Sequence, residues 1–322
     1  MAGINVGVRS FLRLALGVLI IAVIVLSYVF YRLSLPPVEV FNSRGMTHIL
    51  SIYGYGSRPS QQLKRPHDVA FDKRGNIYIT DAGHRRVLVF SSSGRFLRQL
   101  GKAGAGPGEF VTPLGISVGG DGRVYVADES AGKVVIFDAR GKLQREFRVM
   151  MPLKPYVFGG RLYLANYAFV NVYDLNGRYL IDRWGGKGKA GGRFDLPTGL
   201  AVAGKDEIYV ADLNNRRIQV LDRRGKTRLT LGPDGTKGRS WDFGLPSGVV
   251  TDEKKRIYVV DAFAHELDVF QPDGTAPARF SREGQKEGEL YYPAGIAYGG
   301  QGVVAIADKF NDRVQLLRIE LK

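Results

Sequence analysis

Apolar and polar residues alternate along most of the chain after residue 46, in short segments separated by Gly, Pro or charged residues. Segments such as IYITDA and VYVADE place apolar side chains at alternate positions and end in an acidic residue. A period of two over about four to eight residues is typical of β-strands. The alternation therefore predicts a chain built almost entirely of strands.

The strand pattern recurs in six blocks. Each block opens with a proline, at residues 66, 113, 155, 197, 246 and 293, so the spacings are 47, 42, 42, 49 and 47 residues. Within a block the second strand ends in an acidic residue, replaced by Asn in block three, and an apolar residue follows six positions later. Four short strands repeated in this way predict an all-β, six-bladed β-propeller with four-stranded antiparallel blades.

The sixth block ends at Lys322 after its third strand and so lacks a fourth strand of its own. Residues 47–54, THILSIYG, precede the first block and have the pattern of a fourth strand. We expect this N-terminal strand to close the last blade, because pairing the first strand with the last block removes the open edges that a linear array would expose.

An apolar run precedes the blocks. Residues 14–31 read LALGVLIIAVIVLSYVFY, and Ser27 is their only ordinary polar residue. About 20 apolar residues cross a bilayer as a helix, and Arg9 and Arg13 favour a cytoplasmic N-terminus. A cleaved signal peptide is the alternative. The expected organisation is a cytoplasmic N-terminus at 1–13, one transmembrane helix acting as a signal anchor at 14–31, a tether at 32–46 and the propeller at 47–322.

The chain contains no Cys, which excludes disulfides, thiolate zinc sites and Fe–S clusters. It also lacks an Asn-x-Ser/Thr sequon, which is unusual for a eukaryotic ectodomain. We expect a single-pass protein of the bacterial inner (cytoplasmic) membrane, with the propeller in the periplasm or outside the cell. The chain would enter the propeller at the start of a fourth strand. The face of tight Gly turns (the tight-turn face) would then look toward the membrane, and the face of inter-blade and second-to-third-strand loops (the long-loop face) away from it.

Three blocks share a longer motif at the end of the second strand: ITDAGHRRV, VADLNNRRI and IADKFNDRV. Together with the apolar stretch after each opening proline, these residues resemble the NHL-repeat family over about residues 47 to 318. Lys133 and Glu266 replace the motif Arg in blocks two and five, and block three departs most, with Asn166 and Asn171. The resemblance implies a six-bladed propeller but little about activity, since family members range from binding platforms to enzymes.

The strand-end acids are interpreted as framework rather than as a metal ring. Four of the five Asp are followed five residues later by a basic residue, so an ion pair within each blade is expected. Apolar residues three positions before an opening proline are expected to pack beneath the inter-blade loops: Leu63, Phe110, Phe194, Phe243 and Leu290. Strands flank the glycine-rich connections on both sides, so these are inter-blade loops rather than phosphate loops.

Equivalent positions of the blades should ring a central channel. The candidate polar residues at the channel mouth are His67, Asp68, Tyr156, Thr198 and Ser247. Only the first blade offers an imidazole beside a carboxylate, a possible general base for a metal-dependent lyase or hydrolase. The Pro-His dipeptide there is similar to one in the NHL-like peptidylglycine amidating lyases, which bind zinc with three His. The other three His fall on an outer strand or in loops, so we assign no catalytic residue, metal site or cofactor.

The chain carries 46 basic and 31 acidic residues, a formal charge of +15. The loops give the long-loop face a net positive charge, and its candidate binding residues are Arg85, Arg86, Lys133, Arg216, Arg217, Lys309 and Arg313. We therefore expect a non-catalytic binding scaffold whose partner is a protein or an anionic component of the cell envelope. Some NHL relatives bind RNA on a basic face, but an extracytoplasmic location disfavours nucleic acid. A charge that merely keeps the domain in solution is the remaining alternative.

Overall fold

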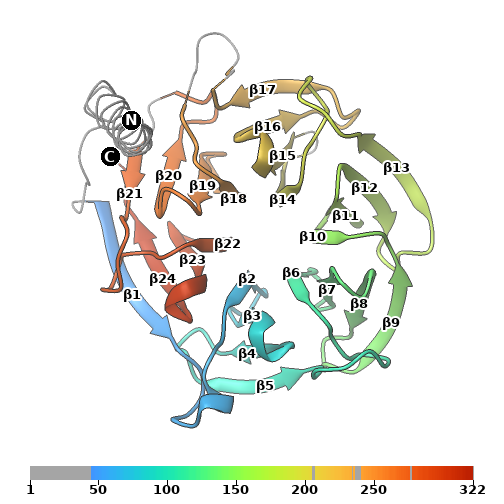
Figure 1. The fold of residues 1–322 in the computed structure, drawn as a ribbon, viewed down its shortest axis with the longest axis vertical. Helices are drawn as coiled ribbons and strands as arrows, with labels where there is room; N and C mark the ends of the chain where they lie inside the picture. The colour runs from blue at the N-terminus through green and yellow to red at the C-terminus, as the bar shows by residue number, and fades with distance from the viewer. Residues whose placement is uncertain (1–44, 205–206, 234, 236–240, 276–277, 322) are drawn as a thin grey trace, which may run out of the picture. The chain divides into compact units, whose positions relative to one another are not determined.

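The structure is a computed structural model that describes residues 45–204, 207–233, 235, 241–275 and 278–321. In these residues six four-stranded sheets surround a central axis (Figure 1). All neighbouring strands in the sheets pair antiparallel. The predicted six-bladed all-β fold is therefore confirmed.

The expected N-terminus, anchor and most of the tether, at 1–13, 14–31 and 32–44, lie outside the described residues. Within the part that the structure describes, no helix is both long enough and apolar enough to cross a membrane.

The first three blades follow one another along the chain. Blade one consists of β2 (Pro66–Phe71), β3 (Ile77–Asp81), β4 (Arg86–Phe90) and β5 (Phe96–Leu100). Blade two consists of β6 (Pro113–Val118), β7 (Val124–Asp128), β8 (Lys133–Phe137) and β9 (Leu143–Arg148). Blade three consists of β10 (Pro152–Phe158), β11 (Arg161–Asn166), β12 (Phe169–Asp174) and β13 (Leu180–Gly185).

The last three blades continue the ring. Blade four consists of β14 (Pro197–Ala203), β15 (Glu207–Asp212), β16 (Arg217–Leu221) and β17 (Thr227–Leu231). Blade five consists of β18 (Pro246–Thr251), β19 (Ile257–Asp261), β20 (Glu266–Phe270) and β21 (Ala278–Phe280). Blade six consists of β22 (Pro293–Gly300), β23 (Val303–Asp308), β24 (Arg313–Ile319) and β1 (Met46–Ile52). Short 3-10 turns in the described loops include η2 (Pro59–Gln61), η3 (Ala82–His84), η4 (Leu213–Asn215) and η6 (Lys309–Asn311).

The ring closes through β1, as predicted. β1 pairs with β24, and the pairs run from Met46 opposite Ile319 to Ile52 opposite Val314. The strand expected at 47–54 is thus found at 46–52. The first strand of the propeller therefore supplies the outer edge of the last blade.

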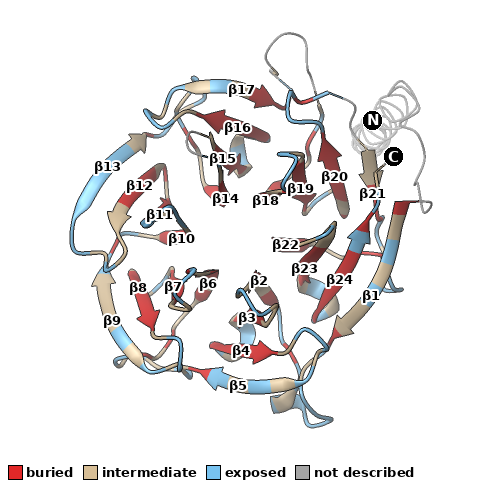
Figure 2. Ribbon diagram, turned by 180° about the vertical axis from the view of Figure 1, so that it is seen from behind, coloured by how far each residue is buried: buried red, intermediate tan, exposed pale blue. Residues whose placement is uncertain are grey.

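The core lies between the blades. The middle strands are covered on both faces by neighbouring blades, so strands such as β7 and β8 are buried at every residue. The outer strand β5 alternates between partly buried and exposed residues (Figure 2). The exposure of residues therefore alternates along an outer strand, where one face reaches solvent, and does not alternate along the fully buried middle strands.

Blade three opens earlier than the sequence predicts. Pro152 pairs with Asn166, and in the other five blades the opening proline pairs with the strand-end acid in the same way. Pro152 rather than Pro155 is therefore the opening proline. The sequence pattern is ambiguous here because both prolines precede an apolar stretch.

The turn between the second and third strands of blade three is two residues shorter than its counterparts. Asn166 pairs with Phe169, whereas the other strand-end acids pair with the residue five positions later. Phe169 rather than Asn171 therefore stands at the position of the framework Arg.

The strand-end Asp side chains hold the inter-blade loops, as predicted. Each accepts a backbone N–H from the loop before its blade: Lys64, Thr112, Asp195, Leu245 and Tyr291 donate to Asp81, Asp128, Asp212, Asp261 and Asp308 respectively. The expected ion pair forms as Arg86–Asp81 (2.8 Å), Arg217–Asp212 (2.9 Å) and Arg313–Asp308 (2.7 Å). In blade two the prediction is wrong, because Lys133 pairs with Glu146 on β9 instead.

The apolar residues expected beneath the inter-blade loops are all buried, with at most 3% of their surface exposed. Parallel bridges such as Ala103–Phe110 and Lys187–Phe194 fold the glycine-rich loops over them. These loops connect neighbouring blades, as predicted.

Replacing Arg313 with Met should lower the free energy of unfolding by about 3–5 kcal/mol. Arg313 is 1% exposed, and its guanidinium donates hydrogen bonds to the Asp308 carboxylate and to the backbone carbonyls of Gln285, Lys286 and Glu289. The matched control is Arg318→Met, because Arg318 lies exposed on the same strand; it should change stability by less than about 0.5 kcal/mol. Urea unfolding followed by circular dichroism measures both variants. Equal losses would show that the buried ion pair is not what holds the blade.

Candidate functional site

The first strands of the six blades contact one another around the central axis. At the second position after the opening proline, four blades carry glycine: Gly115, Gly199, Gly248 and Gly295. A Cβ at Gly199 would lie 2.9 Å from the Cα of Gly248, and one at Gly295 would lie 2.2 Å from Oδ1 of Asp68. The blades can approach so closely because these four positions lack a side chain.

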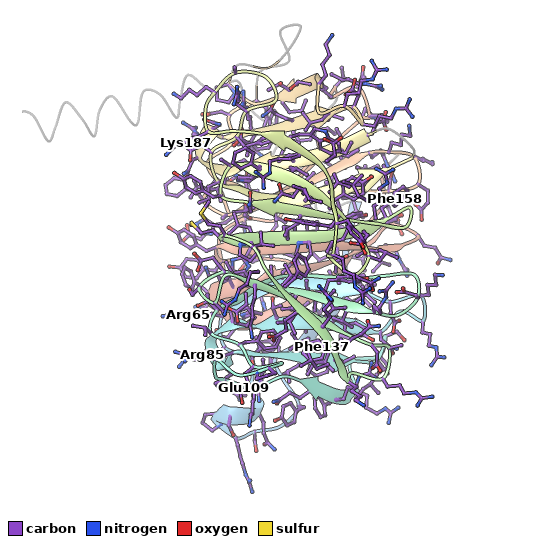
Figure 3. All side chains as sticks on the ribbon, turned by 90° about the vertical axis from the view of Figure 1, so that its right-hand side faces the viewer. Arg65, Arg85, Glu109, Phe137, Phe158 and Lys187 are labelled. Carbon is purple, nitrogen blue, oxygen red and sulfur yellow. The ribbon has the colours of Figure 1, made fainter. Side chains whose placement is uncertain are left out.

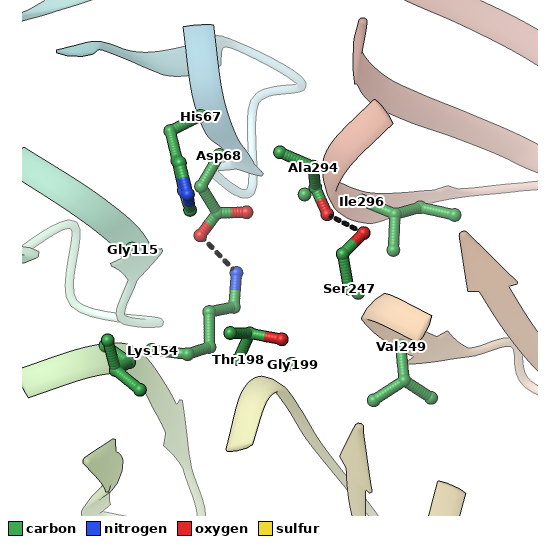
Figure 4. Close-up of a pocket in the computed structure, with 13 residues that line it drawn as sticks. His67, Asp68, Gly115, Lys154, Thr198, Gly199, Ser247, Val249, Ala294 and Ile296 are labelled. Atoms are coloured by element: carbon green, nitrogen blue, oxygen red, sulfur yellow. Dashed lines mark hydrogen bonds and ion pairs between the residues drawn. The ribbon is translucent and has the colours of Figure 1, made fainter. Parts of the chain in front are cut away.

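Asp68 and Lys154 occupy the same position in blades one and three and form an ion pair at the axis (Figure 4). Nζ of Lys154 lies 2.5 Å from Oδ2 of Asp68, which also accepts the Ile116 N–H at 2.8 Å. Both side chains are buried. The sequence pattern did not reveal Lys154, because with Pro155 taken as the opening proline this lysine falls before the first strand of blade three.

The His67–Asp68 general-base pair of the lyase or hydrolase alternative is not assembled. Asp68 faces Lys154, and no hydrogen bond joins it to His67 among the described residues. Burial raises the pKa of the Asp68 carboxyl, and Lys154 and the Ile116 N–H oppose that rise. Burial and the charges of Lys309 and Lys154 lower the pKa of His67 to about 3. Such an imidazole is neutral near pH 7 and too weak to act as a general base there.

The other channel candidates differ in their surroundings. Oγ1 of Thr198 is buried and has no hydrogen-bond partner among the described residues. Ser247 donates its hydroxyl to the Ala294 carbonyl at 2.7 Å. Tyr156 is not at the mouth: it pairs with Tyr163 as Ala201 pairs with Tyr209, so it lies deeper along the inner strand. Its predicted place is wrong because the register of blade three was misassigned.

The space left at the axis is small. The cavity lined by His67, Asp68, Lys154, Thr198 and Ser247 measures about 10 Å³, room for about one water molecule. Within the described ranges no three His, Asp or Glu side chains gather as metal ligands. The axis therefore offers no fit for the metal that the lyase or hydrolase alternative requires.

Most of the predicted basic face is buried. Arg86, Lys133, Arg217 and Arg313 are at most 7% exposed, so their assignment to an exposed binding surface is wrong. Each is the first residue of a third strand and is paired with a carboxylate of its own blade. The sequence pattern gives the framework role of these residues and not their exposure.

The other three predicted residues lie at or near the surface. Arg216 is paired with Asp242 and donates to the Phe243 carbonyl. Arg85 is exposed, and Lys309 is partly buried with its Nζ 5.5 Å from the Phe310 ring centre. The long-loop face is thus less basic than the sequence suggests.

Exposed apolar side chains on this face were missed by sequence reasoning. Met150, Phe263 and Phe310 are 67%, 61% and 45% exposed. Phe263 and Phe310 stand at the same position, two residues after a strand-end Asp, in neighbouring blades. The equivalent position in other blades holds Gly83, Ser130 and Asn214. A Phe at a position that is otherwise small or polar was the sequence signal for an exposed apolar side chain.

Because His67 folds with a lowered pKa, acid should destabilise the protein through this residue. The unfolded imidazole binds a proton below about pH 6.5 and the folded one only below about 3, so stability is lost as pH falls through that window. From pH 7 to pH 5 the wild type should lose about 2 kcal/mol more than His67→Gln. Urea unfolding at both pH values tests this. A His67 ring that titrates near 6.5 by NMR would contradict it.

Comparisons with protein families agree with the fold. Residues 58–183 match a family described as a 6-bladed beta-propeller, and residues 194–221 match the NHL repeat. Protein brain tumor of Drosophila melanogaster is 25% identical over 126 residues, which are 39% of this chain and 12% of that protein. E3 ubiquitin-protein ligase TRIM32 of Mus musculus is 32% identical over 102 residues, 29% of this chain and 16% of that protein. The chain thus spans less than a fifth of either relative.

Among solved structures, a gluconolactonase from Xanthomonas campestris superposes with a TM-score of 0.61 and 14% identity, over 85% of this chain and 98% of that one. At this identity the likeness shows the fold alone. The chain is thus a six-bladed β-propeller that carries an NHL repeat at residues 194–221, as its strand-end motif predicted.

Proposed function

We propose that this chain is a membrane-anchored, extracytoplasmic propeller that binds a protein partner through its long-loop face and is not an enzyme. One observation carries the proposal: Met150, Phe263 and Phe310 stand exposed on loops of that face. Protein interfaces are enriched in Met, aromatic residues and Arg. Arg65 and Arg85 lie on the same face, opposite Phe158 on the tight-turn face (Figure 3).

A protein partner accounts for this surface better than an envelope polymer or a nucleic acid. Binding to a polyanion depends on many free cations, whereas four of the seven predicted cations are buried and Arg216 is paired with Asp242. Exposed Phe side chains can also stack on nucleic-acid bases, but the exposed Met150 gains free energy by burial against an apolar surface, at about 25 cal/mol per Å² buried. The chemistry of the face therefore favours a partner with apolar side chains.

The axis supports a structural role instead of catalysis. Its carboxylate is paired with Lys154, its imidazole is neutral, and the remaining space holds about one water molecule. The relatives are compatible with protein binding, since an E3 ubiquitin-protein ligase acts on proteins by its name. The gluconolactonase shares only the fold.

The anchor rests on the apolar run at 14–31 and on Arg9 and Arg13 before it. β1 begins on the tight-turn face, because Met46 pairs with Ile319 at the end of β24. The chain therefore enters the propeller from that face, and the long loops stay available for a partner.

The full chain should stay in the membrane pellet after alkaline carbonate extraction, and protease added to intact spheroplasts should cleave the propeller. Deleting residues 14–31 should release the chain from the pellet, because it removes the apolar run. Extraction of the full chain by carbonate would refute the anchor. Protection from protease until the cells are lysed would refute the extracytoplasmic location.

Changing Met150, Phe263 and Phe310 together to Ser should reduce capture of the partner by at least about tenfold, the effect of losing about 1.4 kcal/mol. The control changes Phe158, Tyr179 and Leu180 to Ser, because these residues of blade three are 37%, 71% and 47% exposed. Capture is measured by photo-crosslinking of the full chain in its own cells, followed by mass spectrometry. Equal capture by both triple variants would mean that the long-loop face is not the binding surface.

A further inference from the structure

An aromatic and cationic surface spans the long loops of blades five, six and one. It consists of Phe263 after β19, Tyr291 and Tyr292 before β22, Lys309 and Phe310 in η6, and Arg65 before β2. We call these six residues the aromatic–cation patch. Its members come from successive inter-blade and second-to-third-strand loops, which the strand-end Asp residues hold in place.

Three of the four aromatic rings of the patch, Tyr291, Tyr292 and Phe310, pack together around a buried imidazole. His265 is 8% exposed and stacks on Tyr291, with ring centres 5.4 Å apart and planes 10° apart. Nδ1 of His265 accepts the Tyr292 N–H at 3.0 Å, and the Tyr292 ring lies edge-on to Phe310 at 5.3 Å. These three rings are therefore ordered before any partner arrives, which reduces the entropy cost of binding.

The two cations of the patch have no acidic partner for their side chains within the described residues. Nζ of Lys309 lies against the Phe310 ring, and burial together with the Arg65 charge lowers the pKa of Lys309. The nearest carboxylate contact, Asp312, accepts the backbone N–H of Arg65 at 2.6 Å. Two neighbouring positive charges beside exposed rings favour a ligand that brings a carboxylate.

Resting on the proposed function, we propose that the aromatic–cation patch binds a protein segment in which an Asp or Glu lies within about three residues of an aromatic or large aliphatic residue. The carboxylate pairs with Lys309 and Arg65, and the apolar side chain packs on Phe310 and Phe263. Pre-ordered aromatic residues next to Arg are the usual anchors of such interfaces. Two cations are too few for a polyanion to bind by charge alone.

Selection from random 12-residue peptides displayed on phage tests this proposal, with the full chain in lipid nanodiscs as bait. Peptides that bind the wild type should be enriched in an acid close to an aromatic or aliphatic residue. For synthetic copies of the selected peptides, changing the acid to its amide should weaken binding at least about tenfold, because it removes the charge that the cations attract. Enriched peptides without such acids would overturn the proposal.

Substitutions in the chain determine which part of its surface the selected peptides bind. The patch variant combines Phe310→Ala, Lys309→Gln and Arg65→Gln, and should weaken binding at least about tenfold. The control variant combines Phe158→Ala, Arg140→Gln and Arg224→Gln on the tight-turn face, where all three residues are exposed, and should leave affinity unchanged. Phe310→Ala alone should give a smaller loss. It keeps the test valid if the triple variant fails to fold, as judged by circular dichroism, because Phe310 is 45% exposed.

Other outcomes separate this inference from the proposed function. If selected peptides bind the patch variant normally but lose affinity on Met150→Ser, the long-loop face binds protein and the patch assignment is wrong. If no peptide depends on either, both proposals fail. A 12-residue poly-Glu peptide or a 12-nucleotide oligo(U) RNA that binds as tightly as the selected peptides, with the same dependence on the patch, would show recognition of charge or of nucleic acid instead.

Discussion

A buried carboxylate ends the second strand in every blade except blade three, and it fixes the loops on which the rest of this molecule depends. In five blades that Asp accepts a backbone N–H from the preceding inter-blade loop, and in three it also holds an Arg at 2.7 to 2.9 Å. Arg217 and Arg313 then donate to several carbonyls of the same loops. The long loops are therefore fixed by strand ends, although they contain many glycines.

This framework changes how the charge of the chain should be interpreted. The Arg residues of the motif are buried and paired with the strand-end Asp residues. Removing either member of such a pair leaves the other as an uncompensated buried charge. The surface is formed by the residues between the strand-end Asp and that Arg, such as Phe263 and Phe310, and by the residues just before each opening proline, such as Arg65 and Tyr292. The residues repeated from blade to blade thus hold the loops in place. The residues that differ between blades determine which side chains the long-loop face exposes.

The axis follows a second constraint, the close approach of six inner strands. At the second position after the opening proline, four blades carry glycine and leave room for the neighbouring strand. The other two blades carry Asp68 and Lys154, which form an ion pair with each other. An ion pair at this place joins blade one to blade three, and the Ile116 N–H ties blade two to the same carboxylate. The consequence is an axis that is filled except for a cavity of about 10 Å³.

The sequence by itself determined the number of blades, the closing strand and the framework Asp, because each depends on a short-range pattern repeated six times or on a block that lacks a strand. It misplaced the opening of blade three, since two prolines three residues apart both precede apolar stretches and only strand pairing chooses between them. Tertiary structure alone decided which cations are exposed, because Arg85 and Arg86 are neighbours in sequence but point to solvent and into the core respectively. It also decided that Lys154 meets Asp68 and that His265 stacks on Tyr291, since these contacts join residues from different blades that only the folded ring brings together.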